Sequence, residues 1–367
     1  MQNNPLNRLN QLGQSVWLDF IDRTILSDGT LSGLIENDSL AGLTSNPAIF
    51  EQAISQDKAY TNDIDRLVRS GVTPVELYTA LVLDDISQAA DLFLPVYERT
   101  AGRDGYVSIE VSPLLARDSE ASVKEARDLW SRLDRPNIMI KIPGTTEGLV
   151  AVRALLAEGI NVNVTLLFSV ERYIEVLDVY LQAMEQRLAQ GLTVDRVASV
   201  ASFFLSRIDV KIDALLGNVA GEEQAQAHAL RGRVAVACAA LAYRHFQSVT
   251  QSARWQKLGA AGASVQRLLW ASTGTKDPAY SDIKYVEPLV ATDTVNTLPQ
   301  KTMNAYRDHG QPALCIEQSI ADAGSVLTQI AGLKIELAEL MQSLEEEGIR
   351  KFVEPYQSIL EKIKTMV

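Results

Sequence analysis

Short apolar segments alternate along the chain with longer stretches of helical periodicity, such as ASVKEARDLWSRL at residues 121–133. The apolar segments predict strands, and their alternation with helices favours a parallel sheet with right-handed crossovers. Eight strand–helix units favour an α/β fold that closes into a (β/α)8 TIM barrel. The predicted strands span residues 15–20, 40–45, 105–111, 137–142, 160–167, 196–204, 266–273 and 291–298.

The chain has 367 residues, which exceeds the roughly 250 that such a barrel needs. We expect the surplus to form additional helices at about 51–104, in an insert after strand six at about 209–258, and at 317–367. No Pro-, Ser- or Gly-rich linker separates these segments, so residues 1–367 are predicted to form a single domain. Nothing in the insert suggests chemistry. Whether the C-terminal helices pack on the barrel or cover its mouth is left open.

A net charge of −12 argues against nonspecific binding to nucleic acid or to an anionic membrane, although a local basic pocket for a phosphorylated metabolite remains compatible with it. No apolar run is long enough to span a bilayer, and the N-terminus lacks the apolar core of a signal peptide. The two cysteines and three histidines show no metal-ligand spacing, so no metal site is predicted. A cytoplasmic protein, monomer or homodimer, is expected.

Polar side chains concentrate on one face of several predicted strands, towards their carboxyl ends. In INVNVTLL, Asn161, Asn163 and Thr165 share a face, and Val162, Val164 and Leu166 are expected on the other. By the same alternation Asp19, Glu110 and Lys141 lie on the inner faces of their strands, at the end where barrels of this kind carry their active sites. An antiparallel sheet with one wet face would give a similar pattern, but the intervening helices disfavour it. Trp17 and Trp270 fall within strand patterns and are expected in the core.

Lys141 stands at the end of an apolar strand in NIMIKIPGTTEG, just before a Pro-Gly turn. It is either a strand-end lysine in an ion pair or a nucleophilic amine, which desolvation keeps neutral and reactive towards carbonyls. Asp19 and Glu110 at neighbouring strand ends can divide proton transfers beside such an amine, or form a structural ion pair with it. Two carboxyl groups also permit a glycosidase, which has no need of the lysine.

Other polar residues near strand ends are candidates for substrate binding. Asn46 precedes Pro47 and either starts a turn or, with Asn163, holds substrate hydroxyls. Arg207 follows Ser202 and Phe204 in SFFLSRID and can form a surface ion pair or anchor a phosphate. Ser272 ends the seventh strand, and Lys276 lies in the loop beyond it, where many barrels bind phosphate. No Walker or GxGxxG motif supports nucleotide binding.

The chain resembles transaldolase, the Schiff-base-forming class I enzyme of the pentose phosphate pathway, and in particular the longer bacterial branch of that family. The resemblance rests on motifs that run in order from strand one to strand seven and continue into the C-terminal LEEEGIRKFVEPY. The motifs are WLDFIDR at Trp17, TSNPAIF at Thr44, VSIEVSP at Val107, IMIKIPGTTEG at Ile138, INVNVTLLFS at Ile160, ASFFLSRID at Ala201 and WASTGTKDP at Trp270.

The resemblance implies that Lys141 forms the Schiff base and that Asp19 is the acid–base group at the substrate hydroxyl. It implies that Glu110 and Thr165 hold the catalytic water. By the same resemblance, the substrate-binding residues are Asn46, Asn163 and Ser202 for the dihydroxyacetone unit, Phe204 as the aromatic lining, Arg207 for phosphate, and Ser272 with Lys276. The shorter branch has an arginine where this chain has Gly274, so Lys276 is the nearest cation available for phosphate.

The implied reaction moves a dihydroxyacetone unit from sedoheptulose 7-phosphate to glyceraldehyde 3-phosphate, and it needs no cofactor because the iminium withdraws the electrons. Sugar phosphates are then the small-molecule partners. One alternative is a fructose 6-phosphate aldolase of the same fold, which resembles this chain at the lysine but carries an amide at the Glu110 position and a tyrosine near Phe204. The other is a sugar-phosphate-binding barrel without catalysis.

Overall fold

The computed structural model describes residues 4–365, and at its centre eight parallel strands form a closed barrel in sequence order. Each strand pairs with its neighbours in the chain, and β1 pairs with β8 to close the ring. The prediction of a (β/α)8 barrel is confirmed, and every strand ends within three residues of the predicted positions. The strands are β1 (Gln14–Asp19), β2 (Gly42–Thr44), β3 (Tyr106–Glu110), β4 (Ile138–Pro143), β5 (Val162–Leu167), β6 (Ser199–Phe204), β7 (Arg267–Ala271) and β8 (Thr294–Leu298).

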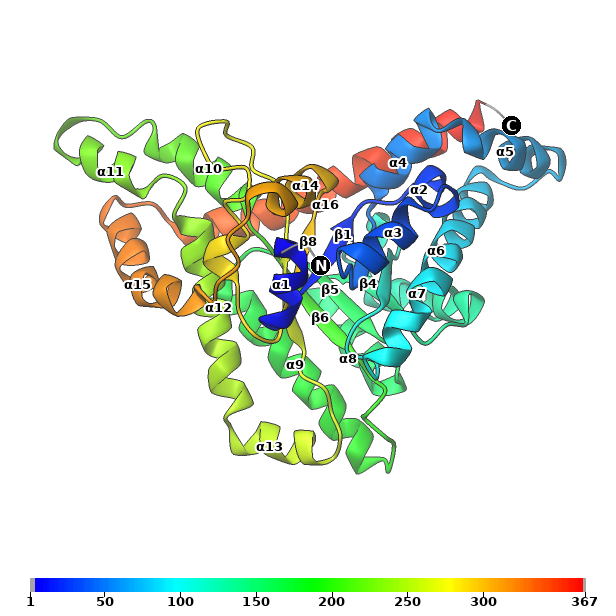
Figure 1. Ribbon diagram of the computed structural model, residues 1–367, viewed down its shortest axis with the longest axis horizontal. Helices are drawn as coiled ribbons and strands as arrows, with labels where there is room; N and C mark the ends of the chain where they lie inside the picture. The colour runs from blue at the N-terminus through cyan, green and yellow to red at the C-terminus, as the bar shows by residue number, and fades with distance from the viewer. Residues whose placement is uncertain (1–3, 366–367) are drawn as a thin grey trace.

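Helices surround the barrel and extend beyond it (Figure 1). Those up to β6 are α1 (Pro5–Gln11), α2 (Arg23–Ser27), α3 (Thr30–Asn37), α4 (Pro47–Gln56), α5 (Thr61–Arg69), α6 (Pro74–Arg99), α7 (Ser119–Leu133), α8 (Thr146–Glu158) and α9 (Val170–Ala189), with 3-10 turns η1 (Lys58–Tyr60) and η2 (Pro113–Leu115). After β6 come α10 (Ser206–Leu216), η3 (Gly221–Glu223), α11 (Gln224–Leu230), α12 (Val234–Thr250), α13 (Ala253–Ala260), η4 (Glu287–Leu289), α14 (Gln300–His309), α15 (Ile316–Gly332) and α16 (Leu337–Lys364).

The turn that follows β4 is fixed by close packing and by a helix cap. A Cβ on Gly144 would lie 2.3 Å from Cδ2 of Leu167, so only glycine lets the chain pass the end of β5 here. The hydroxyl of Thr145 then accepts a hydrogen bond from the Gly148 amide at 2.9 Å and caps the first turn of α8. The Pro-Gly turn predicted from the sequence therefore ends β4 just beyond Lys141.

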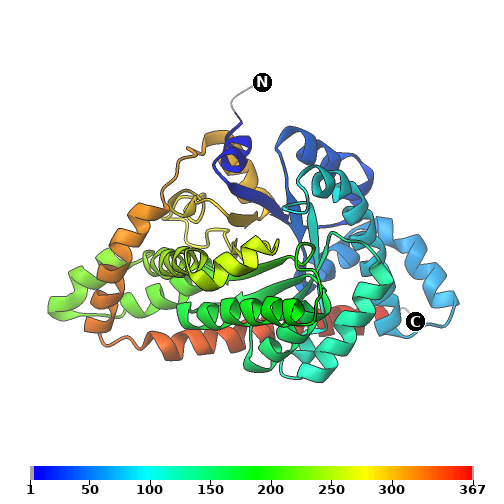
Figure 2. The same ribbon diagram turned by 90° about the horizontal axis from the view of Figure 1, so that it is seen from below.

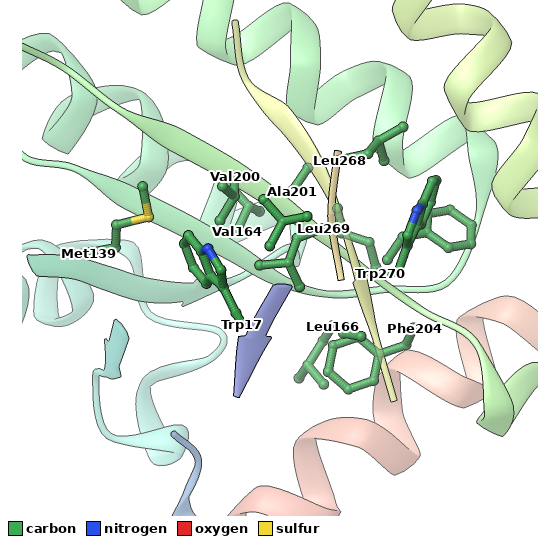
Figure 3. Packing of buried hydrophobic residues seen from close by; sticks show 14 of the residues in the cluster. Trp17, Met139, Val164, Leu166, Val200, Ala201, Phe204, Leu268, Leu269 and Trp270 are labelled. Carbon is green, nitrogen blue, oxygen red and sulfur yellow. The ribbon is translucent and has the colours of Figure 1, made fainter. Parts of the chain in front are cut away.

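Two tryptophans pack on opposite sides of the strand ring, and both are fully buried (Figure 3). Trp17 shares the inward face of β1 with Asp19, and its ring centroid is 6.4 Å from that of Tyr106. Trp270 points outward, and its indole N–H donates to the carbonyl of Leu289 at 3.0 Å. Both residues belong to the core, as the strand patterns indicated.

Strand β5 departs from simple alternation near its end. Its register with β6 shifts between Val164 and Leu167, and Leu166 adopts a positive φ of 61°. A Cβ on Gly348 in α16 would lie 3.1 Å from Cδ2 of Leu166, so this side chain faces α16. The expectation that Leu166 shares the face of Val162 and Val164 is therefore wrong, because the bulge rotates it towards the mouth of the barrel.

The additional helices pack against the barrel and against one another. Figures 1 and 2 show α16 running along one end of the barrel from α15 towards α4, against which it packs. In residues 272–293, which connect β7 to β8, the only helix is the short 3-10 turn η4. We propose that the chain is one domain; residues 1–3 and 366–367 of that prediction lie outside the described residues. Within the described part of the chain, no helix combines the length and apolarity that a membrane crossing requires.

Candidate active site

Lys141 lies near the carboxyl end of β4, between the ends of β3 and β5. Its side chain is buried, with 5% of the residue exposed. The ammonium group forms an ion pair with Oε1 of Glu110, the residue directly across from it on β3, and donates a hydrogen bond of 2.8 Å to the carbonyl of Ser45. These two contacts hold the amine at a fixed place in the mouth of the barrel.

Two buried carboxyl groups accompany this amine. Burial raises the pKa of Asp19, although the charge of Lys141 and a 2.8 Å hydrogen bond from the hydroxyl of Thr44 act in the opposite direction. Burial also raises the pKa of Glu110, against the effect of its ion pair with Lys141. A buried carboxyl group whose pKa lies above the ordinary value is suited to exchange protons near neutral pH.

A cavity of about 810 Å³ opens above these groups at the carboxyl ends of the strands. The predicted site residues that line it are Asp19, Asn46, Lys141, Thr165, Ser202, Phe204, Arg207, Ser272 and Lys276. Side chains from six different stretches of sequence therefore converge on one space. Its volume falls within the range typical of small-molecule sites.

Glu110 and Asn163 do not line this cavity. Glu110 sits beside Lys141, behind it as seen from the cavity, and Asn163 is fully buried below it. The amide nitrogen of Asn163 donates to the hydroxyl of Ser108 at 3.1 Å, and its oxygen accepts from the hydroxyl of Ser202 at 2.6 Å. In this arrangement Asn163 orients Ser202, which does face the cavity.

Arg207 lines the cavity as a cation and forms no ion pair with any residue from 4 to 365. Burial lowers its pKa, against the attraction of Asp19, Glu110 and Glu347. Its guanidinium carbon lies 5.3 Å from the ring centre of Phe204 and 5.9 Å from that of Phe352. The buried Nη1 has no hydrogen-bond partner among residues 4–365. A planar, partly desolvated guanidinium with a donor to spare is suited to bind a phosphate or carboxylate.

The loop after β7 begins with strained backbone at the cavity wall. Ser272 has a φ of 54°, which is unfavourable for a residue with a side chain. Its hydroxyl lies 2.8 Å from that of Ser206 at the start of α10, and its carbonyl accepts from the Ser206 amide at 3.0 Å. These contacts hold the loop that carries Lys276 next to the helix that carries Arg207.

Sequence reasoning missed the residues that α10 and α16 contribute to the cavity. From α16 come Leu340, Leu344, Glu347, Lys351 and Phe352, and from α10 come Val210, Lys211, Ala214 and Leu215. The ring centre of Phe352 lies 5.8 Å from the amine of Lys141, so α16 covers the mouth. The spacing of Leu344, Gly348 and Phe352, four residues apart, is the available signal for a buried stripe on this helix. Lys211, which forms an ion pair with Glu347, belongs to the insert in which no chemistry was expected.

The charged groups of the site carry no sign of a metal centre: in the described ranges, no three His, Cys, Asp or Glu side chains gather as ligands would. The buried amine of Lys141 is the candidate reactive group. A (β/α)8 barrel with a buried lysine between two carboxyl groups, opening into a cationic cavity, defines the class of enzymes that process carbonyl substrates through an imine.

Comparison with known proteins gives the family. The model for the family described as transaldolase/fructose-6-phosphate aldolase matches residues 16–363. The chain is 46% identical to "Transaldolase 2" of Nostoc sp., with 99% of this chain and 98% of the relative covered. It is 45% identical to a transaldolase of Trichodesmium erythraeum, with 100% and 98% covered, and 46% identical to one of Thermobifida fusca, with 98% and 97% covered. The chain belongs to the transaldolase/fructose-6-phosphate aldolase family, and it is an enzyme of the transaldolase type.

Proposed function

We propose that this enzyme transfers a dihydroxyacetone unit from a ketose phosphate, such as sedoheptulose 7-phosphate, to an aldose phosphate, such as glyceraldehyde 3-phosphate. The reaction belongs to the non-oxidative pentose phosphate pathway, and we expect it to take place in the cytoplasm. The observation that carries the proposal is the arrangement at Lys141: one carboxyl group paired with the amine, a second one, Asp19, directed elsewhere, and an unmatched guanidinium across the cavity.

The first half-reaction forms the imine. Glu110 takes a proton from the Lys141 ammonium, and the neutral amine adds to C2 of the ketose to give a carbinolamine. Glu110 then returns its proton to the C2 hydroxyl, the C–O bond breaks, and water leaves with formation of the iminium. The direct ion pair between Lys141 and Glu110 supports the assignment of these proton transfers to Glu110. Thr165, whose buried hydroxyl has no hydrogen-bond partner among the described residues, supplies a further contact for that water.

The second step breaks the carbon–carbon bond. Asp19 removes the proton of the C4 hydroxyl, the electrons of the C3–C4 bond move into the iminium, and an aldose phosphate departs from the resulting enamine. Among residues 4–365, Asp19 accepts a hydrogen bond only from Thr44 and forms no ion pair with Lys141, so its carboxyl group remains available for the substrate hydroxyl. The enamine then attacks the carbonyl of the acceptor, and the steps run in reverse.

Binding of the substrate divides between the two ends of the cavity. We assign the dihydroxyacetone unit to Asn46 and to Ser202, which Asn163 orients. The oxygen of Asn46 caps α4 by accepting from the Ile49 amide at 3.0 Å, which leaves its amide nitrogen for the substrate. We assign the phosphate to Arg207 and Lys276, with Ser272 at the turn between their segments.

A simple aldolase of the same family is the second candidate. Two residues favour the transferase: Glu110, which stands where the related aldolases have an amide, and Phe204, which stands near where they have a tyrosine. An apolar ring at this place gives a water molecule no hydrogen bond, so the enamine is better protected from protonation and hydrolysis. The cover that Phe352 and α16 place over the amine supports the same conclusion.

The experiment is an assay with and without an acceptor. With sedoheptulose 7-phosphate alone, we expect slow consumption limited to the first turnover; with glyceraldehyde 3-phosphate added, we expect steady formation of fructose 6-phosphate. Release of free dihydroxyacetone at an equal rate without an acceptor would show an aldolase. Activity that survives in Lys141→Ala would rule out the imine and leave a mechanism based on the carboxyl groups.

A further inference from the structure

A second, small cavity lies behind Glu110, on the side away from the substrate. It is bounded by the end of β3 and by helices α4, α6, α7 and α16, and its volume is about 40 Å³. We call it the rear cavity and define it by Glu110, Asn46, Tyr78, Ser112, Glu125 and Tyr356 among its lining residues. It shares Asn46 with the substrate cavity but not Lys141.

Several of the side chains that line the rear cavity carry polar groups. Besides Glu110 it contains Glu125 of α7, whose Oε2 accepts from the Ser112 amide at 3.2 Å. The rings of Tyr78 and Tyr356 meet edge to face with centroids 5.3 Å apart, which brings α6 and α16 together at this place. Burial raises the pKa of Glu125 and of Tyr78. Carboxyl and hydroxyl groups removed from bulk water in this way require polar partners.

The size of the rear cavity suits water and excludes a sugar. A water molecule needs about 10–15 Å³ of such space together with two to four polar partners. The rear cavity therefore has room for about three water molecules among its carboxyl and hydroxyl groups. Glu125 is only partly buried, so this wall of the rear cavity lies close to the protein surface.

Glu110 lies between the Lys141 amine and the rear cavity. One of its oxygens contacts the Lys141 amine, which faces the substrate, whereas Glu110 itself lines the rear cavity. Imine formation releases one water molecule from C2, and imine hydrolysis consumes one. The mouth of the substrate cavity is covered by α16, and a wet mouth would expose the enamine to hydrolysis.

From this geometry we propose that the rear cavity is the water compartment of the reaction, with Glu110 as its gate and Glu125 as the residue that positions the water. The inference rests on the function proposed above. During imine formation the C2–OH bond of the carbinolamine breaks, Glu110 supplies the proton, and the water formed passes into the rear cavity. During hydrolysis a water from the rear cavity adds its oxygen to C2 and gives a proton to Glu110. Apart from this one water, which contacts Thr165 as it forms or adds, the substrate side can then stay dry.

The test follows oxygen exchange at the ketose carbonyl. Enzyme and fructose 6-phosphate are mixed in 18O-labelled water, and incorporation of 18O at C2 is measured by mass spectrometry above the enzyme-free rate. Glu125→Leu removes the carboxyl group that positions the water from the rear cavity at nearly constant volume, so exchange should fall about tenfold. Glu125→Gln keeps polar atoms in place and should recover exchange to within about threefold. Tyr78→Phe removes a hydroxyl from the opposite wall and should lower exchange about threefold.

Matched measurements separate this role from damage to the site. After borohydride reduction at equilibrium, the ratio of three-carbon to six-carbon adducts on Lys141 reports the carbon–carbon step, which needs no water, and should be unchanged in Glu125→Leu. Asp128→Asn, on the exposed face of the same helix, should exchange oxygen as the native enzyme does. The inference would be overturned if Glu125→Leu and Tyr78→Phe both exchange oxygen at the native rate. It would also be overturned if Glu125→Gln does not recover oxygen exchange. Absence of any adduct on Lys141 in the native enzyme would instead refute the proposed function.

Discussion

Arg207 lines the substrate cavity, and we assign it to the substrate phosphate. It stands between two aromatic rings with a buried donor that no described residue uses. Replacing it with glutamine should raise KM for ketose phosphates about 10- to 100-fold, with a smaller effect on kcat, because a charged hydrogen-bonding partner of the phosphate is lost. Steady-state kinetics with sedoheptulose 7-phosphate measure this change.

Unphosphorylated donors provide the control. Arg207→Gln should leave kcat/KM for fructose close to the native value, since no phosphate is present to be bound. Lys276→Gln, measured in the same way, determines whether the loop lysine shares the phosphate. An equal loss for both kinds of donor in Arg207→Gln would mean that the residue shapes the site and does not bind the phosphate.

The ionised Asp19 carboxyl group is expected to lower the stability of the fold at neutral pH while it provides the catalytic base. Its raised pKa means that the folded protein holds this proton more tightly than the unfolded chain does. The free energy of unfolding therefore falls as pH rises from the ordinary carboxyl value, about 4, through the raised pKa. Asp19→Asn removes the cost at pH 7, so it should unfold with a free energy about 1 kcal/mol higher while losing at least about 100-fold in kcat.

Thermal unfolding at several pH values checks the sign. The gain in Tm of Asp19→Asn over the native enzyme should be largest at pH 7 and should shrink as pH is lowered to below about 4, where the Asp19 carboxyl group is protonated in both the folded and the unfolded state. If Asp19→Asn is less stable than the native enzyme at pH 7, then the electrostatic attraction between Lys141 and the Asp19 carboxylate outweighs the cost of burying that carboxylate.

At the scale of residues, alternation along strands was a sufficient guide to the inner face. It placed Lys141, Asp19 and Glu110 at one end of the barrel because the period of two holds through β1, β3 and β4. It did not reveal that Asn163 uses both amide atoms on Ser108 and Ser202, since that depends on the distance across the barrel. The position of Phe352 could not be predicted for the same reason, because only the path of α16 brings its ring near Lys141.

Helix α16 is the element on which closure of the site depends. Gly348 lets it approach the bulge in β5, because a Cβ there would lie 3.1 Å from Leu166 and 3.3 Å from Phe168. Gly348→Val should push the helix outward, cost about 1–3 kcal/mol of stability, and move Phe352 away from Lys141. We expect the ratio of dihydroxyacetone release to transfer to rise several-fold, measured with and without acceptor.

A glycine at which a Cβ would meet no other atom serves as the control for the substitution in α16. Gly324 in α15 would place a Cβ in open space, so Gly324→Ala should raise stability by up to about 1 kcal/mol through helix propensity, with native partitioning. If Gly348→Val transfers the dihydroxyacetone unit as cleanly as the native enzyme, then the cover of α16 does not protect the intermediate.

At the scale of elements, the sequence was informative about which segments are strands and less so about their irregularities. The apolar runs predicted each strand because buried parallel strands require them. The bulge at Leu166 left no such mark, since VTLL continues an ordinary strand pattern. The helix that covers the mouth has a recognisable apolar stripe, but a stripe does not say which surface it meets.

At the end of the barrel opposite the site, a buried ion pair connects β7 to β1 and to the segment before β3. Arg267 of β7 donates to Oδ1 of Asp104 at 2.9 Å and to the hydroxyl of Ser15 on β1 at 2.8 Å, and Ser15 in turn donates to Oδ2 of Asp104 at 2.9 Å. Arg267→Met leaves Asp104 buried without its partner and should lower the free energy of unfolding by about 3–5 kcal/mol. Because this is the amino end of the strands, kcat of the folded variant should stay within about twofold of native.

An exposed pair near the same place gives the comparison. Arg103 and Asp293 form a 2.8 Å ion pair with both side chains nearly half exposed, so Arg103→Met should cost at most about 1 kcal/mol. Chemical denaturation of both variants measures the difference. Equal losses would mean that the buried network contributes no more than a surface contact, and a large loss of kcat in Arg267→Met would contradict the separation of the two ends.

At the scale of the whole molecule, eight alternating units were enough to predict a closed barrel, because short right-handed crossovers leave few other arrangements. The positions of the additional helices were not predictable, since they depend on contacts between segments far apart in the chain. Glu347 and Lys211, which join α16 to α10 above the site, are 136 positions apart. The shape of the mouth is therefore a property of the fold that local pattern does not contain.

A covalent imine between Lys141 and a ketose phosphate is the step on which the proposed mechanism depends. Incubation with fructose 6-phosphate, reduction with borohydride, and mass spectrometry of the peptides test it directly. We expect a three-carbon adduct on the peptide that contains Lys141, approaching one per chain, together with its loss in Lys141→Arg. No adduct, or an adduct on a different lysine, would rule out an imine at Lys141.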